Sequence, residues 1–257
     1  MSKNKKIIIA NWKMNPVSTK EAKKLFLGIK ITASKLKNVQ TVVCPPFVYL
    51  NELVSEYKGH RIAIGAQDSF SENAGSFTGM VSPKMLKNSG VEYVIIGHSE
   101  RRALGEDNKM INEKTKASIK SGLKVILCVG ERSRDEQGKQ FSFIKKELVE
   151  SLDGIAKGSL KNIFVAYEPI WAISNNSKNK AMSSNDIHEM TIFIKKVLTD
   201  KFGVGMKIAG VLYGGSAGPL NTKDILENGN ADGLLVGRSS LDAKKFNRIL
   251  ETANNIE

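Results

Sequence analysis

The sequence has few cysteines and no long apolar run, and each absence excludes a class of protein. Its two cysteines, Cys44 and Cys128, lie in apolar strand-like segments, where free buried thiols are expected. A small secreted fold held together by disulfides would need more cysteines. No run of about eighteen apolar residues occurs, so we expect no membrane-spanning helix and no membrane partner. We therefore expect a cytoplasmic protein.

Acidic residues are also scarce, with 26 Asp and Glu against 39 Lys and Arg, which gives a formal net charge of +13. Excess positive charge is one mark of nucleic-acid binding. The basic residues are spread along the chain, however, without zinc-finger spacing, an aromatic RNA-binding motif or an arginine-rich block. We expect a lysine-rich surface that attracts anionic metabolites, and no nucleic-acid partner.

What the sequence does contain is a regular alternation of apolar runs and charged segments with helical spacing. Several runs are apolar at consecutive positions and rich in Ile and Val, as strands buried on both faces are. The predicted strands are 6–12, 41–45, 61–67, 91–98, 123–130, 162–168, 207–215 and 232–237. In one helical segment, Asn185 is a candidate N-cap and Gly203 marks the end.

Eight strands that alternate with helices favour parallel pairing, and eight strands can close a (βα)8 barrel with outer helices. No linker-like change in composition occurs, so we expect an α/β fold in which residues 1–257 form a single domain. A doubly wound open sheet is the alternative. Because no G-x-G-x-x-G follows the first strand, a dinucleotide-binding version of that sheet is disfavoured.

In a (βα)8 barrel the chemistry occurs where strands end, and Glu168 ends the sixth predicted strand. Pro169 biases the residue before it toward an extended conformation, which would project the carboxylate into the barrel mouth. A carboxylate in a dry pocket can serve as a general base. A glutamate before a proline is, taken alone, more often a surface residue paired with a lysine. The other strand ends reverse that preference.

Those ends carry further polar groups. His98 follows the fourth strand and precedes a predicted helix start, where the positive end of the helix dipole disfavours imidazolium and favours a neutral hydrogen-bond donor. Asn11 and Lys13 end the first strand and add a neutral donor and a cation, with Glu100 as a candidate counter-ion. No cluster of His, Cys or carboxylates has the spacing of a metal site, so we expect no metal.

Small residues end the last two strands, in YGGSAG (213–218) and VGRSS (236–240). Backbone N–H groups of such loops converge on a phosphate in many barrels. Together with the polar strand ends, these loops predict proton abstraction next to a carbonyl in a small phosphorylated substrate.

The motifs that carry this prediction also resemble those of a known family. They are ANWKMN (10–15), IIGHSERR (95–102), AYEPIWAI (166–173), YGGS (213–216) and DGLLVG (232–237). In this order and spacing they resemble the triosephosphate isomerase family, from residue 6 to about residue 241. The resemblance implies an isomerase of glycolysis and gluconeogenesis that interconverts dihydroxyacetone phosphate and glyceraldehyde 3-phosphate through an enediolate, without a cofactor.

The resemblance also implies roles for single residues. Glu168 would be the base, and His98 with Asn11 would polarise the carbonyl. Lys13 would offset the developing charge, oriented by Glu100. Phosphate-binding residues would be Ser174, Ser216, Gly237 and Arg238, through backbone N–H groups. A mobile lid would include Pro169, Ile170, Trp171, Ala172, Ile173, Asn175 and Asn176.

A homodimer is implied as well. The loop 69–79 is long for a connection between a strand and a helix, and long loops are usually functional. In the family this loop inserts into a second subunit, where Thr78 would support Asn11 and Lys13. Phe70 and Phe77 favour an interface over a floppy surface loop, because aromatic side chains this close together usually bury against something.

Three positions depart from the family pattern. Ser-Asn-Asn-Ser at 174–177 replaces the usual Gly-Thr-Gly-Lys of the lid tip, Arg238 replaces a glycine, and Met80 replaces a glutamate. None of them touches the predicted proton-transfer residues. Two alternatives stay open at this point: another phosphate-binding barrel, such as a sugar-phosphate epimerase or an amino-sugar isomerase, and an inactive barrel that only binds ligands.

Overall fold

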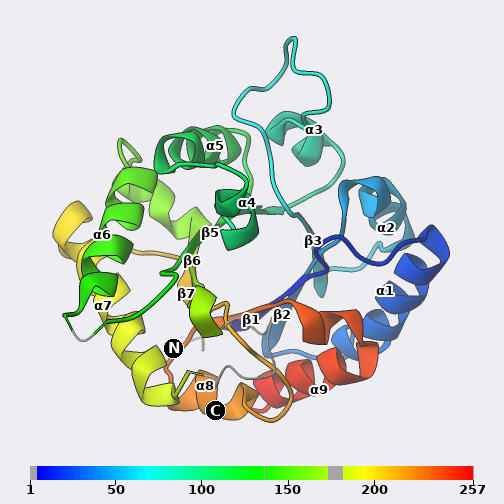
Figure 1. Cartoon of the computed structure of the whole chain (residues 1–257). Helices are drawn as coiled ribbons and strands as arrows, with labels where there is room; N and C mark the ends of the chain where they lie inside the picture. The colour runs from blue at the N-terminus through cyan, green and yellow to red at the C-terminus, as the bar shows by residue number, and fades with distance from the viewer. Residues whose placement is uncertain (1–4, 136, 173–181, 257) are drawn as a thin grey trace.

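The computed structural model describes residues 5–135, 137–172 and 182–256, and its strands close into a parallel barrel (Figure 1). The strands are β1 (Lys6–Asn11), β2 (Val39–Cys44), β3 (Ile62–Ala66), β4 (Tyr93–Ile96), β5 (Lys124–Val129), β6 (Ile163–Tyr167), β7 (Gly210–Tyr213) and β8 (Gly233–Val236). Each strand pairs with the next along the chain, and β8 pairs with β1. The predicted (βα)8, or TIM, barrel is confirmed, and the open sheet is excluded.

Every predicted strand overlaps an observed one, and all run longer than observed except the second, which was predicted as 41–45 and is observed as Val39–Cys44. The fourth was expected to reach His98 and instead ends at Ile96, because Gly97 adopts a φ of 73° and turns the chain out of the sheet. The sixth ends at Tyr167, which leaves Glu168 as the first residue beyond β6. An apolar pattern continues past the last ladder hydrogen bond, so it cannot mark where the sheet stops.

Helices surround the barrel (Figure 1). They are α1 (Thr19–Ala33), α2 (Leu50–Glu56), α3 (Pro83–Asn88), α4 (Ser99–Ala103), α5 (Asn108–Lys120), α6 (Lys139–Ser151), α7 (Ser184–Phe202), α8 (Thr222–Glu227) and α9 (Ala243–Asn254). Short 3-10 turns occur at Phe47–Tyr49, Lys157–Asn162, Ile170–Ala172 and Arg238–Leu241. In the part of the chain that the structure describes, no helix combines the length and apolar character needed to cross a membrane.

The N-cap predicted for α7 was wrong by two residues. Ser183 caps the helix, and its hydroxyl accepts the Asp186 N–H at 3.2 Å, whereas Asn185 lies inside the first turn. Both residue types suit an N-cap, and the sequence alone did not separate them. Gly203 follows the last helical residue with a φ of 81°, as expected for a glycine that ends a helix.

The core has two layers, because successive strand residues point to opposite faces. Ile7 and Ile9 of β1 belong to the cluster that fills the barrel interior, together with residues such as Ile126 of β5. Ile8 belongs to the larger cluster between the strands and the helices, which includes Phe26 of α1. The two cysteines are free and buried, as predicted. This packing fixes the strand ends that carry the polar residues.

Candidate active site

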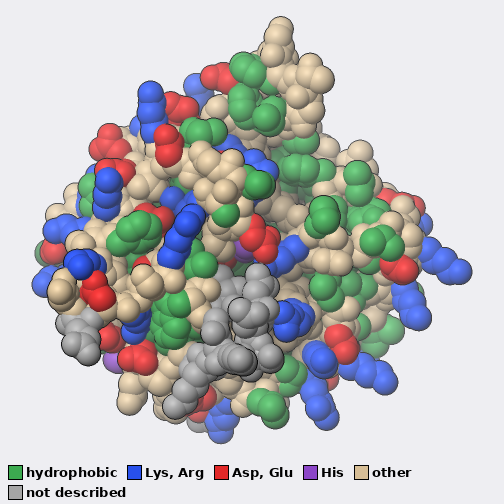
Figure 2. Space-filling model, viewed as in Figure 1, with side chains coloured by type: hydrophobic (Ala, Val, Ile, Leu, Met, Phe, Trp, Pro, Cys, Tyr) green, Lys and Arg blue, Asp and Glu red, His purple; other side chains and the backbone are tan. Residues whose placement is uncertain are grey.

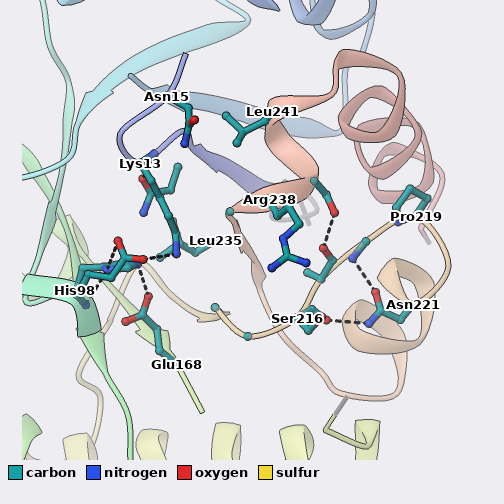
Figure 3. Close-up of a pocket in the computed structure, with 18 of the residues that line it drawn as sticks. Lys13, Asn15, His98, Glu168, Ser216, Pro219, Asn221, Leu235, Arg238 and Leu241 are labelled. Atoms are coloured by element: carbon teal, nitrogen blue, oxygen red, sulfur yellow. Dashed lines mark hydrogen bonds and ion pairs between the residues drawn. The ribbon is translucent and has the colours of Figure 1, made fainter. Parts of the chain in front are cut away.

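A pocket of about 590 Å³ opens where the strands end, and side chains from several strand ends point into it (Figure 3). Its lining includes all five of the residues that were predicted to take part in proton transfer or charge stabilisation: Asn11, Lys13, His98, Glu100 and Glu168. The barrel therefore brings together groups that are up to 157 positions apart in the chain (168 minus 11). No group of three or more His, Cys, Asp or Glu suited to a metal occurs among the described residues.

Glu168 and His98 face each other at the wall of this pocket. Glu168 Oε1 lies 3.1 Å from His98 Nε2, and the carboxylate side chain is only 2% exposed. Its other oxygen, Oε2, accepts the Ser99 N–H at 2.9 Å. His98 Nδ1 accepts the Glu100 N–H at 3.2 Å. Because Nδ1 acts as an acceptor, the ring carries its proton on Nε2 and is set up as a neutral donor.

Two glycines allow the Glu168 backbone to lie where it does. A Cβ atom at Gly130 would collide with the Glu168 carbonyl group, and one at Gly214 would come within 2.9 Å of Glu168 Cγ. The Glu168 N–H is fixed by a 2.8 Å bond to the Val129 carbonyl. The loops after β5 and β7 must therefore carry glycine here. Sequence reasoning missed Gly130, whose only signal was its place at the end of the fifth predicted strand.

Lys13 and Asn11 form a tight turn after β1. Lys13 has a φ of 53°, which is uncommon for a residue with a side chain, and its N–H donates to Asn11 Oδ1 at 3.0 Å. Lys13 Nζ lies 2.6 Å from Glu100 Oε1, so the expected ion pair is present. Gln67 was missed: its Nε2 donates to the carbonyl groups of Lys13 at 2.8 Å and Cys44 at 2.9 Å.

The predicted phosphate-binding residues lie in two loops on the other side of the pocket. Ser216 follows β7, while Gly237 and Arg238 follow β8, and all three line the pocket. Figure 3 shows the Arg238 side chain pointing into the pocket from its loop. Ser174, the fourth residue of the set, lies outside the described residues.

Hydrogen bonds hold these two loops in shape. Asn221 Nδ2 donates to the Ser216 carbonyl at 2.9 Å, and Asn221 Oδ1 accepts the Gly218 N–H at 2.8 Å. Ser239 Oγ donates to the Ala217 carbonyl at 3.1 Å, which ties the loop after β8 to the loop after β7. Asn221 and Ser239 also line the pocket, and sequence reasoning assigned neither of them a role.

The segment after Glu168 begins as a short turn anchored to a buried glutamate. Trp171 Nε1 donates to Glu131 Oε1 at 2.8 Å, and the Ile170 N–H donates to the Glu131 carbonyl at 3.0 Å. The same Oε1 accepts Tyr167 O–H at 2.8 Å and Arg134 Nε at 3.1 Å. Burial raises the pKa of Tyr167 above its usual range, so the phenol keeps the proton that it donates.

Of the residues predicted to form a lid, Pro169, Ile170, Trp171 and Ala172 are thus placed, and Ala172 is buried. Ile173, Asn175 and Asn176 lie outside the described residues. Thr78 is exposed and lies in loop 69–79, which projects from the barrel (Figure 1). It is not part of the pocket lining of its own chain.

An eight-stranded parallel barrel with this pocket at its strand ends belongs to the class of (βα)8-barrel enzymes. Residues 6–253 match the family model described as "Triosephosphate isomerase". The chain therefore belongs to the triosephosphate isomerase family.

Relatives named triosephosphate isomerase match nearly the whole chain. The protein from Natranaerobius thermophilus is 38% identical over 249 residues, which cover 96% of this chain and 95% of that protein. The protein from Alkaliphilus oremlandii is 40% identical, with 94% and 97% covered. One from Dehalococcoides mccartyi is 39% identical, with 98% and 97% covered.

Proposed function

We propose that this protein is an isomerase that interconverts dihydroxyacetone phosphate and glyceraldehyde 3-phosphate through an enediolate. Family membership supports the reaction, which is a step of glycolysis and gluconeogenesis. The observation that carries the mechanism is the buried Glu168 carboxylate, 3.1 Å from His98 Nε2, in one pocket with Asn11 and Lys13. No cofactor is needed, because a base and hydrogen-bond donors suffice for this proton transfer.

In this proposal Glu168 takes a proton from the carbon next to the substrate carbonyl and returns it to the neighbouring carbon. Without substrate, the carboxylate is held by Ser99 N–H and faces His98. A substrate carbonyl that accepts a hydrogen bond from His98 Nε2–H would replace Glu168 Oε1 as the partner of that N–H group.

Developing negative charge on the substrate oxygen is met by three groups. His98 donates as neutral imidazole, Asn11 donates through its amide, and Lys13 supplies positive charge. Glu100 positions the Lys13 ammonium group through their 2.6 Å ion pair. Such preorganised donors stabilise the transition state without reorganising during the reaction.

The phosphate is proposed to lie between the loops after β7 and β8. Backbone N–H groups of Ser216, Gly237 and Arg238 would bind it, joined by Ser174. The segment that starts at Pro169 would act as the lid over the phosphate, with Ile170, Trp171, Ala172, Ile173, Asn175 and Asn176 as its further residues.

The first test is conversion of glyceraldehyde 3-phosphate, followed with a coupled dehydrogenase, in the parent protein and in Glu168→Gln. We expect the variant to lose about 10² to 10⁴ of kcat, the usual contribution of a positioned general base. Glu189→Gln is the matched control, because Glu189 is exposed on α7. No activity in the parent would favour the inactive ligand-binding barrel. Equal activity in Glu168→Gln would contradict the assigned base.

We further propose that residues 1–257 form one domain and that two copies associate through loop 69–79, in the cytoplasm. Thr78 of one copy would then support Asn11 and Lys13 of the other. The exposed position of Thr78 on a projecting loop supports this arrangement.

A further inference from the structure

The charges that line the described part of the pocket are balanced before any substrate arrives. Two acidic side chains, Glu100 and Glu168, and two basic ones, Lys13 and Arg238, contribute to the lining. Lys13 is already paired with Glu100 at 2.6 Å. A phosphate ester brings about −1.5 to −2 charges near neutral pH. Arg238 is the second cation of this described lining, and it lies on the loop after β8, on the side of the proposed phosphate site.

The backbone that carries Arg238 is fixed on both sides. A Cβ atom at Gly237 would lie 3.3 Å from Lys13 Cε, so this loop packs closely on the Lys13 side chain. Ser239 Oγ donates to the Ala217 carbonyl at 3.1 Å, and Ser240 Oγ donates to the Gly237 carbonyl at 2.6 Å. Arg238 therefore projects from a turn whose backbone is held by contacts with Lys13 on one side and with Ala217 on the other.

Its side chain is exposed and directed into the pocket, over the loop that contains Ser216 (Figure 3). A guanidinium group offers a planar fork of N–H donors that matches phosphate oxygens in a bidentate manner, and it stays charged at all relevant pH values. A glycine in this place, as the family resemblance leads one to expect, would offer only its backbone N–H.

We propose that the Arg238 guanidinium binds the substrate phosphate directly, in addition to the backbone N–H groups of the two loops. This inference rests on the proposed function, and it makes Arg238 a residue that sets the affinity for phosphorylated ligands. The same group makes the enzyme sensitive to inorganic phosphate, which competes for the same cation.

The test uses Arg238→Gln, Arg238→Gly and Arg238→Lys, with Arg248→Gln as the control. Arg248 is exposed on α9 and is not in the pocket lining. Arg248→Gln removes the same positive charge as Arg238→Gln, but away from the pocket. We expect Arg238→Gln and Arg238→Gly to lower kcat/KM for glyceraldehyde 3-phosphate by about three- to tenfold, the range for a partly exposed charge-assisted contact. The inhibition constant for inorganic phosphate should rise by a similar factor, Arg238→Lys should lie in between, and Arg248→Gln should match the parent.

An unchanged phosphate inhibition constant in Arg238→Gln would overturn the inference, even if kcat/KM fell, because a merely structural effect could lower activity. Equal effects of Arg238→Gln and Arg248→Gln would also overturn it, in favour of general electrostatic attraction. Failure of the proposed function is a separate outcome, seen as a parent without isomerase activity. In that case calorimetric titration of the parent and Arg238→Gln with inorganic phosphate still decides the role of Arg238.

Discussion

At the scale of single residues, Gly130, the residue after β5, contacts the backbone of Glu168 and the carboxylate of Glu147. Its backbone packs against the Glu168 carbonyl, and its N–H donates to Glu147 Oε2 at 2.9 Å. Glu147 Oε1 also pairs with Arg102 Nη1 at 3.1 Å. Burial nevertheless raises the pKa of Glu147 to about 7, because loss of solvent outweighs the attraction of Arg102.

This raised pKa predicts a pH-dependent stability. The ordinary value for a glutamate is 4.5, and the folded value is about 7. Between these values the folded state binds more protons than the unfolded state, so this group makes the free energy of unfolding fall as pH rises. The glutamine side chain of the Glu147→Gln variant cannot ionise. The free energy of unfolding of this variant should therefore fall less steeply between about pH 4.5 and pH 7 than that of the parent.

Urea unfolding at several pH values between these limits measures the effect, with the exposed Glu189→Gln as control. Parallel curves for the parent and Glu147→Gln would show that the Glu147 carboxyl titrates at the same pH in both states. A lower stability of the variant at every pH would not count against the prediction, since only the slope reports titration.

At the scale of elements, the connection from β6 to α7 carries both the proposed base and the start of the proposed lid. Glu168 is fixed to β5 by the Val129 carbonyl, whereas Trp171 is fixed to the Glu131 side chain. The two anchors use different acceptors, the Val129 backbone and the Glu131 side chain. Tyr167 shares the Glu131 acceptor but belongs to β6.

Glu131 accepts one hydrogen bond from Trp171 of the proposed lid segment and one from Tyr167 of β6. The variants Trp171→Phe and Tyr167→Phe remove these two bonds one at a time. Each removes one donor to a buried carboxylate and should reduce the free energy of unfolding by about 1 to 2 kcal/mol. Only Trp171→Phe alters the lid segment, so it should lower kcat/KM by at least about threefold, because hinge residues change kcat and KM together. Equal losses of kcat/KM in the two variants would instead assign the effect to Glu131 itself.

At the scale of the whole molecule, loop 69–79 is a folded projection (Figures 1 and 2). Its base is closed by a 2.8 Å bond from the Phe70 N–H to the Val81 carbonyl, and the Phe70 and Phe77 rings lie 4.7 Å apart between centroids. Phe77 remains 44% exposed and Met80 55% exposed. A shaped loop that presents apolar side chains to solvent is suited to a second copy of the chain.

Phe77→Asp should therefore separate the proposed dimer. Placing an unpaired carboxylate in an apolar contact costs several kcal/mol, which raises the dimer dissociation constant by at least about a hundredfold. Light scattering should show the mass fall from two chains to one chain of 28.2 kDa. Activity should fall with it, because Thr78 no longer reaches the second copy.

Val204→Asp is the matched control, since Val204 is 89% exposed beyond α7, at the end of the barrel where β7 begins. It adds the same charge and should leave the mass unchanged. A parent that already has the mass of one chain would refute the dimer, and an unchanged mass in Phe77→Asp would place the interface elsewhere.

The sequence by itself determined the order of the strands and helices, and it identified the groups proposed to react. Strands buried on both faces leave continuous apolar runs, and polar residues that interrupt them at their ends, such as Glu168 and His98, stand out for that reason. The same local signals did not fix the exact ends of the elements. Apolar character continues past Ile96, the last residue of β4, and two residues suited to an N-cap occur near the start of α7.

Only the tertiary structure decided how those groups are partnered. Closure of β8 on β1, the Ser99 N–H bond to Glu168, the Gln67 contact with Lys13 and the Glu131 anchor of Trp171 join distant parts of the chain. Such pairings depend on strand register and loop path, which local residue patterns do not contain. The tertiary structure also decided the direction of the Arg238 side chain, because its loop packs against Lys13 and Ala217.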